Sequence, residues 1–92
     1  MSRAFVKEDT GGPDHRYSLP EPDSPYYDEA AAWALLEGAD RGDSLGAEAA
    51  TGYRWGEPLL VPHVQKILDR AREQGEDRLA QLARRFLREA GA

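Results

Sequence analysis

The chain has 92 residues, a formal net charge of −5 and no cysteine. This length allows one domain, the lack of cysteine excludes disulfides, cysteine-type zinc sites and thiol nucleophiles, and the acidic balance argues against non-specific binding to the nucleic-acid backbone. No apolar run reaches the roughly 18 residues that a membrane-spanning helix requires, and the N-terminus lacks the apolar block of a secretory signal, so we expect an unprocessed cytoplasmic protein.

The first 23 residues show no helical periodicity. Glycine and proline recur along them, at Gly11, Gly12, Pro13, Pro20 and Pro22. Ahead of these positions, residues 3–7 alternate charge and apolar bulk, with Phe5 and Val6 as the large apolar side chains. We expect residues 1–23 to form an extended N-terminal arm that adds little to a core, and residues 24–92 to form one helical domain.

A first helix is predicted to begin with Ser24 as its N-cap and Pro25 at its first helical position, and to end near Arg41. Apolar residues cover two adjacent arcs of this helix: Tyr27, Ala31, Ala32, Ala34, Leu35, Leu36 and Ala39. A helix that is apolar over more than one stripe packs on several neighbours, so we expect it to be the central helix of the fold.

Tyr26 and Trp33 fall on the remaining face of this helix, among acidic residues. They are either half-exposed aromatic side chains or the surface that Phe5 and Val6 of the arm cover, because aromatic area of this size is costly to leave in water. The second interpretation predicts that the arm docks on the first helix of its own chain or of a second subunit in a homodimer.

A short second helix is predicted from Leu45 to Thr51. Asp43 or Ser44 can cap its start, and Gly52 can end it in the left-handed conformation.

The loop after this helix contains Tyr53, Arg54 and Trp55 between two glycines. A cation beside aromatic rings is typical of sites that bind a partner or stack on nucleic-acid bases. The alternative is that the large side chains close one end of a small helical core.

A third helix begins between Leu59 and Pro62 and ends at Gln74 and Gly75, and a fourth helix follows directly. Each has an apolar stripe, made by Val61, Val64, Ile67, Leu68 and Ala71 in the third and by Leu79, Leu82, Ala83, Phe86, Leu87 and Ala90 in the fourth. Because the connection is short, these helices are expected to form an antiparallel αα-hairpin. The fold class is therefore all-α, a small bundle of about four helices.

Basic residues gather on the polar face of the fourth helix, where Arg78, Arg84, Arg85 and Arg88 surround Gln81. Such a stripe can hold an acidic protein surface or an RNA strand. Alternatively, the cations complement the dipole at the helix C-terminus and keep the surface solvated.

Residues with catalytic or metal-binding chemistry are few. His15 and His63 have no second ligand at helical spacing, and Glu76 with Asp77 reads as a first-turn acidic pair that stabilises the fourth helix. We therefore expect no catalytic residue, no cofactor and no metal. The dominance of arginine over lysine and the absence of asparagine are compatible with a GC-rich genome or a thermophilic source.

The segment Ser2–Asp9, followed after a polar gap by Leu19–Pro25, resembles the leader of bacterial Gre-type transcript-cleavage factors of the GreB-like branch. The resemblance implies an association with RNA polymerase and covers about a quarter of the chain. Gre factors also have a long coiled coil with an acidic, metal-binding tip and a β-rich domain, and neither has a counterpart in this sequence. The resemblance therefore carries over no cleavage activity and no catalytic residue.

These patterns favour a non-enzymatic protein–protein interaction module, linked through the leader to transcription machinery. Its candidate partner-binding residues are Phe5, Val6, Tyr26, Trp33, Tyr53, Arg54, Trp55, Arg84, Arg85 and Arg88. The alternative is a nucleic-acid-binding domain, in which the second and third helices form a helix-turn-helix. A recognition helix needs basic or amide groups near its start, whereas residues 57–60 are acidic and apolar, so nucleic acid is the less favoured partner.

Overall fold

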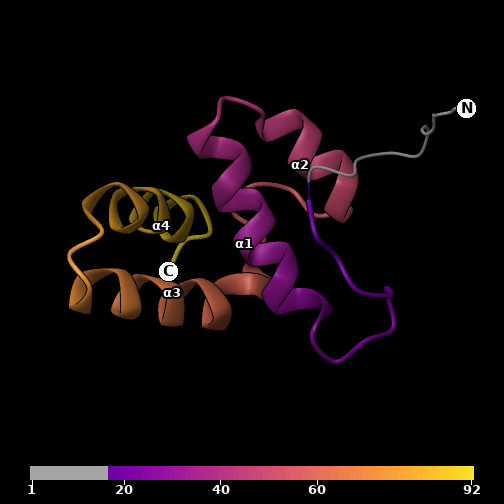
Figure 1. Cartoon of the computed structure of the whole chain (residues 1–92), viewed down its shortest axis with the longest axis horizontal. Coiled ribbons are helices and arrows are strands. Elements are labelled where there is room, and N and C mark those ends of the chain that lie inside the picture. Colours follow the sequence, from indigo (N-terminus) through magenta and orange to yellow (C-terminus); the bar gives the residue numbers. More distant parts are fainter. Residues whose placement is uncertain (1–16) are drawn as a thin grey trace, which may run out of the picture.

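A computed structural model describes residues 17–92, which fold into an all-α structure (Figure 1). Its elements are α1 (Tyr27–Asp40), α2 (Ser44–Thr51), the short 3₁₀ helix η1 (Pro58–Leu60), α3 (Val61–Glu73) and α4 (Asp77–Glu89). The prediction of a four-helix, all-α fold is thus confirmed for this part of the chain. Phe5, Val6 and the predicted docking of the arm lie outside the described residues.

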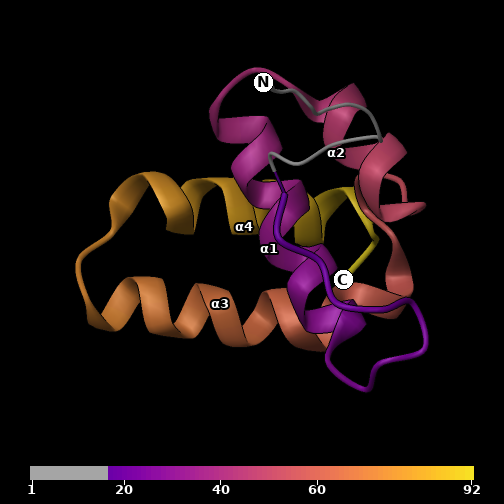
Figure 2. The same ribbon diagram turned by 45° about the vertical axis from the view of Figure 1, so that its right-hand side comes forward.

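The central position predicted for the first helix is confirmed. α1 contacts α2, η1, α3 and α4, and it crosses the α3–α4 hairpin while α2 packs against its C-terminal half (Figures 1 and 2). The close approach of α2 depends on Gly38, because a Cβ atom at this position would lie 2.5 Å from the Cβ of Ala47. A helix with alanines and leucines around most of its circumference can pack against all of these neighbours.

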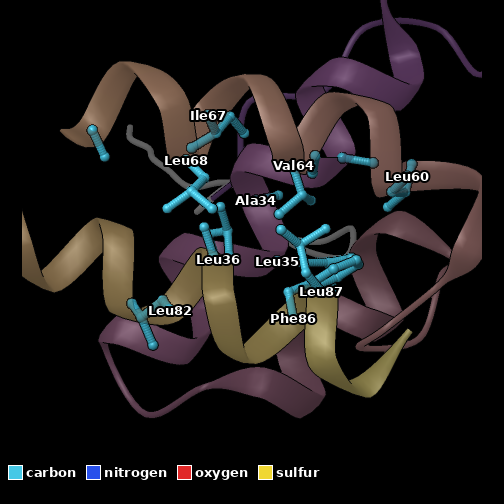
Figure 3. Packing of buried hydrophobic residues seen from close by; sticks show 14 of the residues in the cluster. Ala34, Leu35, Leu36, Leu60, Val64, Ile67, Leu68, Leu82, Phe86 and Leu87 are labelled. Atoms are coloured by element: carbon cyan, nitrogen blue, oxygen red, sulfur yellow. The ribbon is translucent and has the colours of Figure 1, made fainter. Parts of the chain in front are cut away.

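α3 and α4 form the predicted antiparallel hairpin, and their apolar stripes meet beneath α1. Figure 3 shows this core, in which the largest fully buried side chains are Phe86, Leu35, Leu36, Leu60 and Val64. Gly75 ends α3 with a φ of 70°, in the left-handed region where a glycine avoids the steric cost of a Cβ atom.

The start of the first helix differs from the prediction. α1 begins at Tyr27, two residues after the predicted first helical position at Pro25. Ser24 instead closes a turn ahead of the helix, since its Oγ accepts a hydrogen bond from the N–H of Tyr26 and its carbonyl oxygen accepts one from Tyr27, both at 3.1 Å.

The expectation that residues 1–23 add little to the core is wrong for Tyr17. Its ring is only 4% exposed and belongs to the main apolar cluster, and its hydroxyl donates a 2.8 Å hydrogen bond to Oδ2 of Asp43. Asp43 occupies the N-cap position of α2 as predicted but makes no side-chain capping bond there. One buried aromatic ring gives no periodic signal in the sequence, although it removes a large apolar area from water.

Candidate functional site

Trp33, in the middle of α1, is half-buried and lines three surface hollows. The largest hollow, here named the Trp33 groove, has a volume of about 420 Å³ and lies between α1 and the start of α4. Its lining residues are Trp33, Leu36, Glu37, Asp40, Glu76, Asp77, Arg78, Leu79 and Leu82. Among the sequence-predicted site residues that fall within residues 17–92, only Trp33 lines this groove.

The floor of the Trp33 groove is apolar. Leu36 and Leu82 are buried beneath it, while Trp33 and Leu79 are only partly covered and pack against the core from the side. Helical spacing puts these side chains together: Trp33 and Leu36 lie three residues apart on α1, and Leu79 and Leu82 have the same spacing on α4. The groove therefore offers aromatic and aliphatic surface that is open to an apolar ligand.

The rim of the groove is acidic. Among the described residues that line it, four are carboxylates and one is a cation, Arg78, which pairs through Nε with Oδ1 of Asp40 at 3.0 Å. A terminal nitrogen of Arg78 also donates to the side-chain oxygen of Gln81 at 3.0 Å. Within residues 17–92, Glu37, Glu76 and Asp77 have no ion-pair partner, so the groove has an excess of negative charge.

The other two hollows adjoin the same tryptophan. One, of about 230 Å³, lies against α3 and is lined by Glu29, Trp33, His63, Lys66, Ile67 and Arg70. The other, here named the Ser18 hollow, has a volume of about 340 Å³ and is lined by Ser18, Ala30, Trp33, Ala34, Glu37 and Arg41. The hollow against α3 thus has two cations and one carboxylate among its described lining residues, whereas the Trp33 groove has one cation and four carboxylates, so the surface around this ring changes sign from one side to the other.

Tyr53 is held inside the fold by its hydroxyl group. The hydroxyl donates a 2.6 Å hydrogen bond to Oδ1 of Asp28, and the ring lies 6.4 Å from that of Tyr27. The hydrogen bond to the Asp28 carboxylate, aided by burial, raises the pKa of Tyr53 to about 12. This arrangement supports the interpretation that the side chain closes one end of the core.

Trp55 packs in the same way. Its ring meets Phe86 edge to face at a centroid distance of 5.0 Å, and its backbone N–H donates to Oε2 of Glu48 at 2.7 Å. Arg54, between the two aromatic residues, is exposed. A partner-binding role for Arg54 therefore stays a prediction, while its neighbours Tyr53 and Trp55 belong largely to the folded body.

The remaining predicted residues lie outside the three hollows. Tyr26 is 69% exposed at the start of α1, and Arg84, Arg85 and Arg88 are exposed on α4. Arg78 differs from the other arginines of the predicted stripe because it is part of the Trp33 groove. The proposed partner roles of these exposed residues are still predictions.

The arrangement of α2 and α3 bears on the helix-turn-helix alternative. α2 packs against α1 and makes no contact with α3, whereas the two helices of that motif pack against each other. This arrangement disfavours a helix-turn-helix.

No group of three or more histidine or acidic residues in residues 17–92 is placed to hold a metal ion. None of the helices in the described part of the chain is both long and apolar enough to cross a membrane.

Most of the groove is not apparent from the sequence. The apolar periodicity places Leu79 and Leu82 on a core stripe, and the helix dipole accounts for Glu76 and Asp77 at the start of the fourth helix. One signal was available, since Glu37 and Asp40 follow Trp33 at intervals of four and seven residues and so share its face of the helix. The contribution of α4 depends on the tertiary crossing of the two helices.

Comparison of the chain with models of protein families, with curated proteins and with solved structures finds no significant match.

Proposed function

We propose that this chain is a protein–protein interaction module whose Trp33 groove binds a cationic, amphipathic segment of a protein partner. The observation that carries the proposal is an apolar floor surrounded by carboxylates, of which three have no cationic partner within residues 17–92. A half-buried tryptophan in such a setting is the type of residue that contributes most to binding energy at interfaces.

The chemistry of the groove defines the ligand. Apolar side chains of the partner would cover Trp33 and Leu79, and lysine or arginine side chains beside them would meet Glu37, Glu76 and Asp77. Attraction between opposite charges speeds encounter and selects partners, while the apolar contacts supply most of the affinity. The resemblance of the leader to that of Gre factors makes RNA polymerase the first candidate partner. This candidate depends on the resemblance alone.

The proposal is tested by cross-linking from the rim of the groove. A photoreactive benzophenone amino acid replaces Asp77 in one protein and Leu45 in a control, since Leu45 is 81% exposed on α2 and lies outside the groove. We expect the Asp77 position, and not the Leu45 position, to cross-link to a defined partner in cells. Mass spectrometry of the adduct then identifies the partner segment, which should be apolar and basic.

Charge reversal provides the matched control. Glu37→Lys/Glu76→Lys changes two exposed rim residues, and Asp23→Lys/Asp69→Lys makes the same change in net charge at exposed positions outside the groove. An exposed ion pair contributes about 0.2–1 kcal/mol, so loss of two such pairs should weaken binding of the purified partner roughly two- to thirtyfold while the control binds normally. Equal loss in both variants, or loss in neither, would refute binding at the groove.

Two further outcomes are informative. If polymerase subunits are absent from the adducts that depend on the groove, the identification of RNA polymerase fails while the interaction site stands. A salt-dependent shift of labelled duplex DNA or single-stranded RNA by the purified chain would instead support the nucleic-acid-binding alternative.

A further inference from the structure

We propose that in the free protein the chain's own segment Ser2–Lys7 occupies the Trp33 groove, and that a protein partner must displace it. The displacement rests on the proposed function, whereas the intramolecular contact does not. The segment lies outside the described residues. Its composition, the chemistry of the groove and the point where the described chain begins all favour this docking site.

The segment matches the groove in chemistry. It places Phe5 and Val6 between two cations, Arg3 and Lys7, which is the composition that an apolar floor with an acidic rim selects. The hollow on the other face of Trp33 carries two cations, Lys66 and Arg70, and one carboxylate, Glu29, so its net positive charge would repel the same cations. Charge complementarity therefore favours the α4 side of Trp33 over the α3 side.

The chain emerges beside the groove. Tyr17 is anchored by burial and by its hydrogen bond to Asp43, with the Arg41 guanidinium 5.1 Å from the centre of its ring. The next residue, Ser18, lines a hollow that shares Trp33 and Glu37 with the Trp33 groove. The described part of the chain thus begins beside a hollow that adjoins the proposed docking site.

The connection is long enough and its closure costs little. Residues 8–16 separate the segment from Tyr17, and nine extended residues span up to about 30 Å. Because loop-closure entropy grows only with the logarithm of length, a tethered segment of this kind has an effective concentration in the millimolar range at its own groove. Contacts with a dissociation constant about tenfold below that concentration, roughly 0.1 mM, then keep the groove about nine-tenths occupied.

This placement revises the docking site expected from the sequence. Tyr26 was expected to be covered together with Trp33, but it is 69% exposed, lies at the start of α1 and lines none of the three hollows. Glu37 and Asp40, which line the groove, follow Trp33 toward the other end of the helix. The proposed docking site therefore lies at the C-terminal half of α1 and the start of α4.

The absence of cysteine allows a direct test in the full chain. A nitroxide attached to Glu8→Cys should broaden the amide resonances of Leu36, Asp40 and Leu79, and reduction of the nitroxide should restore them. Phe5→Asp/Val6→Asp should abolish the broadening, whereas Thr10→Asp/Gly11→Asp, with the same added charge, should preserve it. Resonances of the groove that are unaffected by the label, or equally affected in both variants, would overturn the proposal.

Mixing distinguishes docking within one chain from docking between copies. Isotope-labelled protein without the nitroxide is mixed with spin-labelled protein at natural isotope abundance, and no broadening is expected. Broadening in this mixture would overturn the intramolecular contact and would indicate exchange of the segment between two subunits.

The affinity for the partner then tests whether the partner must displace the segment. If the segment fills the groove about nine-tenths of the time, Phe5→Asp/Val6→Asp should bind the cross-linked partner about tenfold more tightly than the unmodified chain. Unchanged affinity would overturn the displacement while leaving the proposed function intact. Failure of the proposed function has a different signature: in the Phe5→Asp/Val6→Asp background, where the segment no longer competes for the rim, the rim charge reversals would leave partner binding unaffected.

Discussion

Gly38→Ala is expected to destabilise the fold by up to about 2 kcal/mol, even though alanine is the better helix former. In the interior of a helix, alanine is favoured over glycine by about 1 kcal/mol. At this position, however, the new Cβ would lie 2.5 Å from the Cβ of Ala47 and 2.9 Å from the carbonyl oxygen of Asp43. Neither atom can rotate away, so α2 must move relative to α1, and such overpacking costs about 1–3 kcal/mol.

The assay is urea unfolding followed by far-ultraviolet circular dichroism, with tryptophan fluorescence as a second probe. A domain of this size has a free energy of unfolding of roughly 4–10 kcal/mol, so the expected loss lowers the transition midpoint measurably at an unchanged slope. Removing the opposing methyl group in Gly38→Ala/Ala47→Gly should recover part of the loss, with a coupling energy of about 0.5–3 kcal/mol. Stabilisation by Gly38→Ala alone, or a coupling of zero, would refute the account of a glycine-dependent helix contact.

Three other perturbations test the fold around the site. Tyr17→Phe should lower the free energy of unfolding by about 1–2 kcal/mol because the Asp43 carboxylate loses the hydroxyl donor, and equal midpoints in urea for the two proteins would contradict the anchoring role of Tyr17. Phe86→Ala empties a fully buried position and should cost about 3–5 kcal/mol, so thermal unfolding should show a midpoint lowered by more than about 10 °C, and an unchanged midpoint would contradict the core role of this ring. Ultraviolet titration of the tyrosines should show one phenol with a midpoint near pH 12, and Asp28→Asn should return it toward 10. Because the pKa of Tyr53 is raised in the folded state, its stabilising effect is complete below pH 10 and is lost as the pH rises from 10 to about 12, so an unchanged phenol titration in the variant would contradict the assignment.

The amino-acid pattern was sufficient to predict the four helices because each helix has its own local sequence signal. The apolar stripes of α3 and α4 repeat at helical spacing, Gly52 and Gly75 stop α2 and α3 with φ values of 79° and 70°, and the short connection leaves the hairpin no other arrangement. The central position of α1 followed from the same kind of evidence, since a helix that is apolar on most sides can be satisfied only by several neighbours.

Contacts between residues far apart in the chain could not be predicted in this way. Tyr17 joins the core through Asp43, 26 residues later, and Arg78 pairs with Asp40 across 38 residues. No local periodicity encodes such pairs, because they depend on how the helices cross. The pairing of Tyr53 with Asp28 belongs to the same class.

The sequence by itself thus determined the helices, their apolar faces and the hairpin, because these depend on residues a few positions apart. Only the tertiary structure decided that Trp33 stands over a groove, that Leu79 completes its floor and that carboxylates of α1 and α4 share its rim. The crossing of α1 over α4 brings together two sets of side chains, one from each helix. Taken alone, each set has the pattern of an ordinary solvated helix face. A surface assembled from separate elements acquires its shape and charge only when those elements pack together.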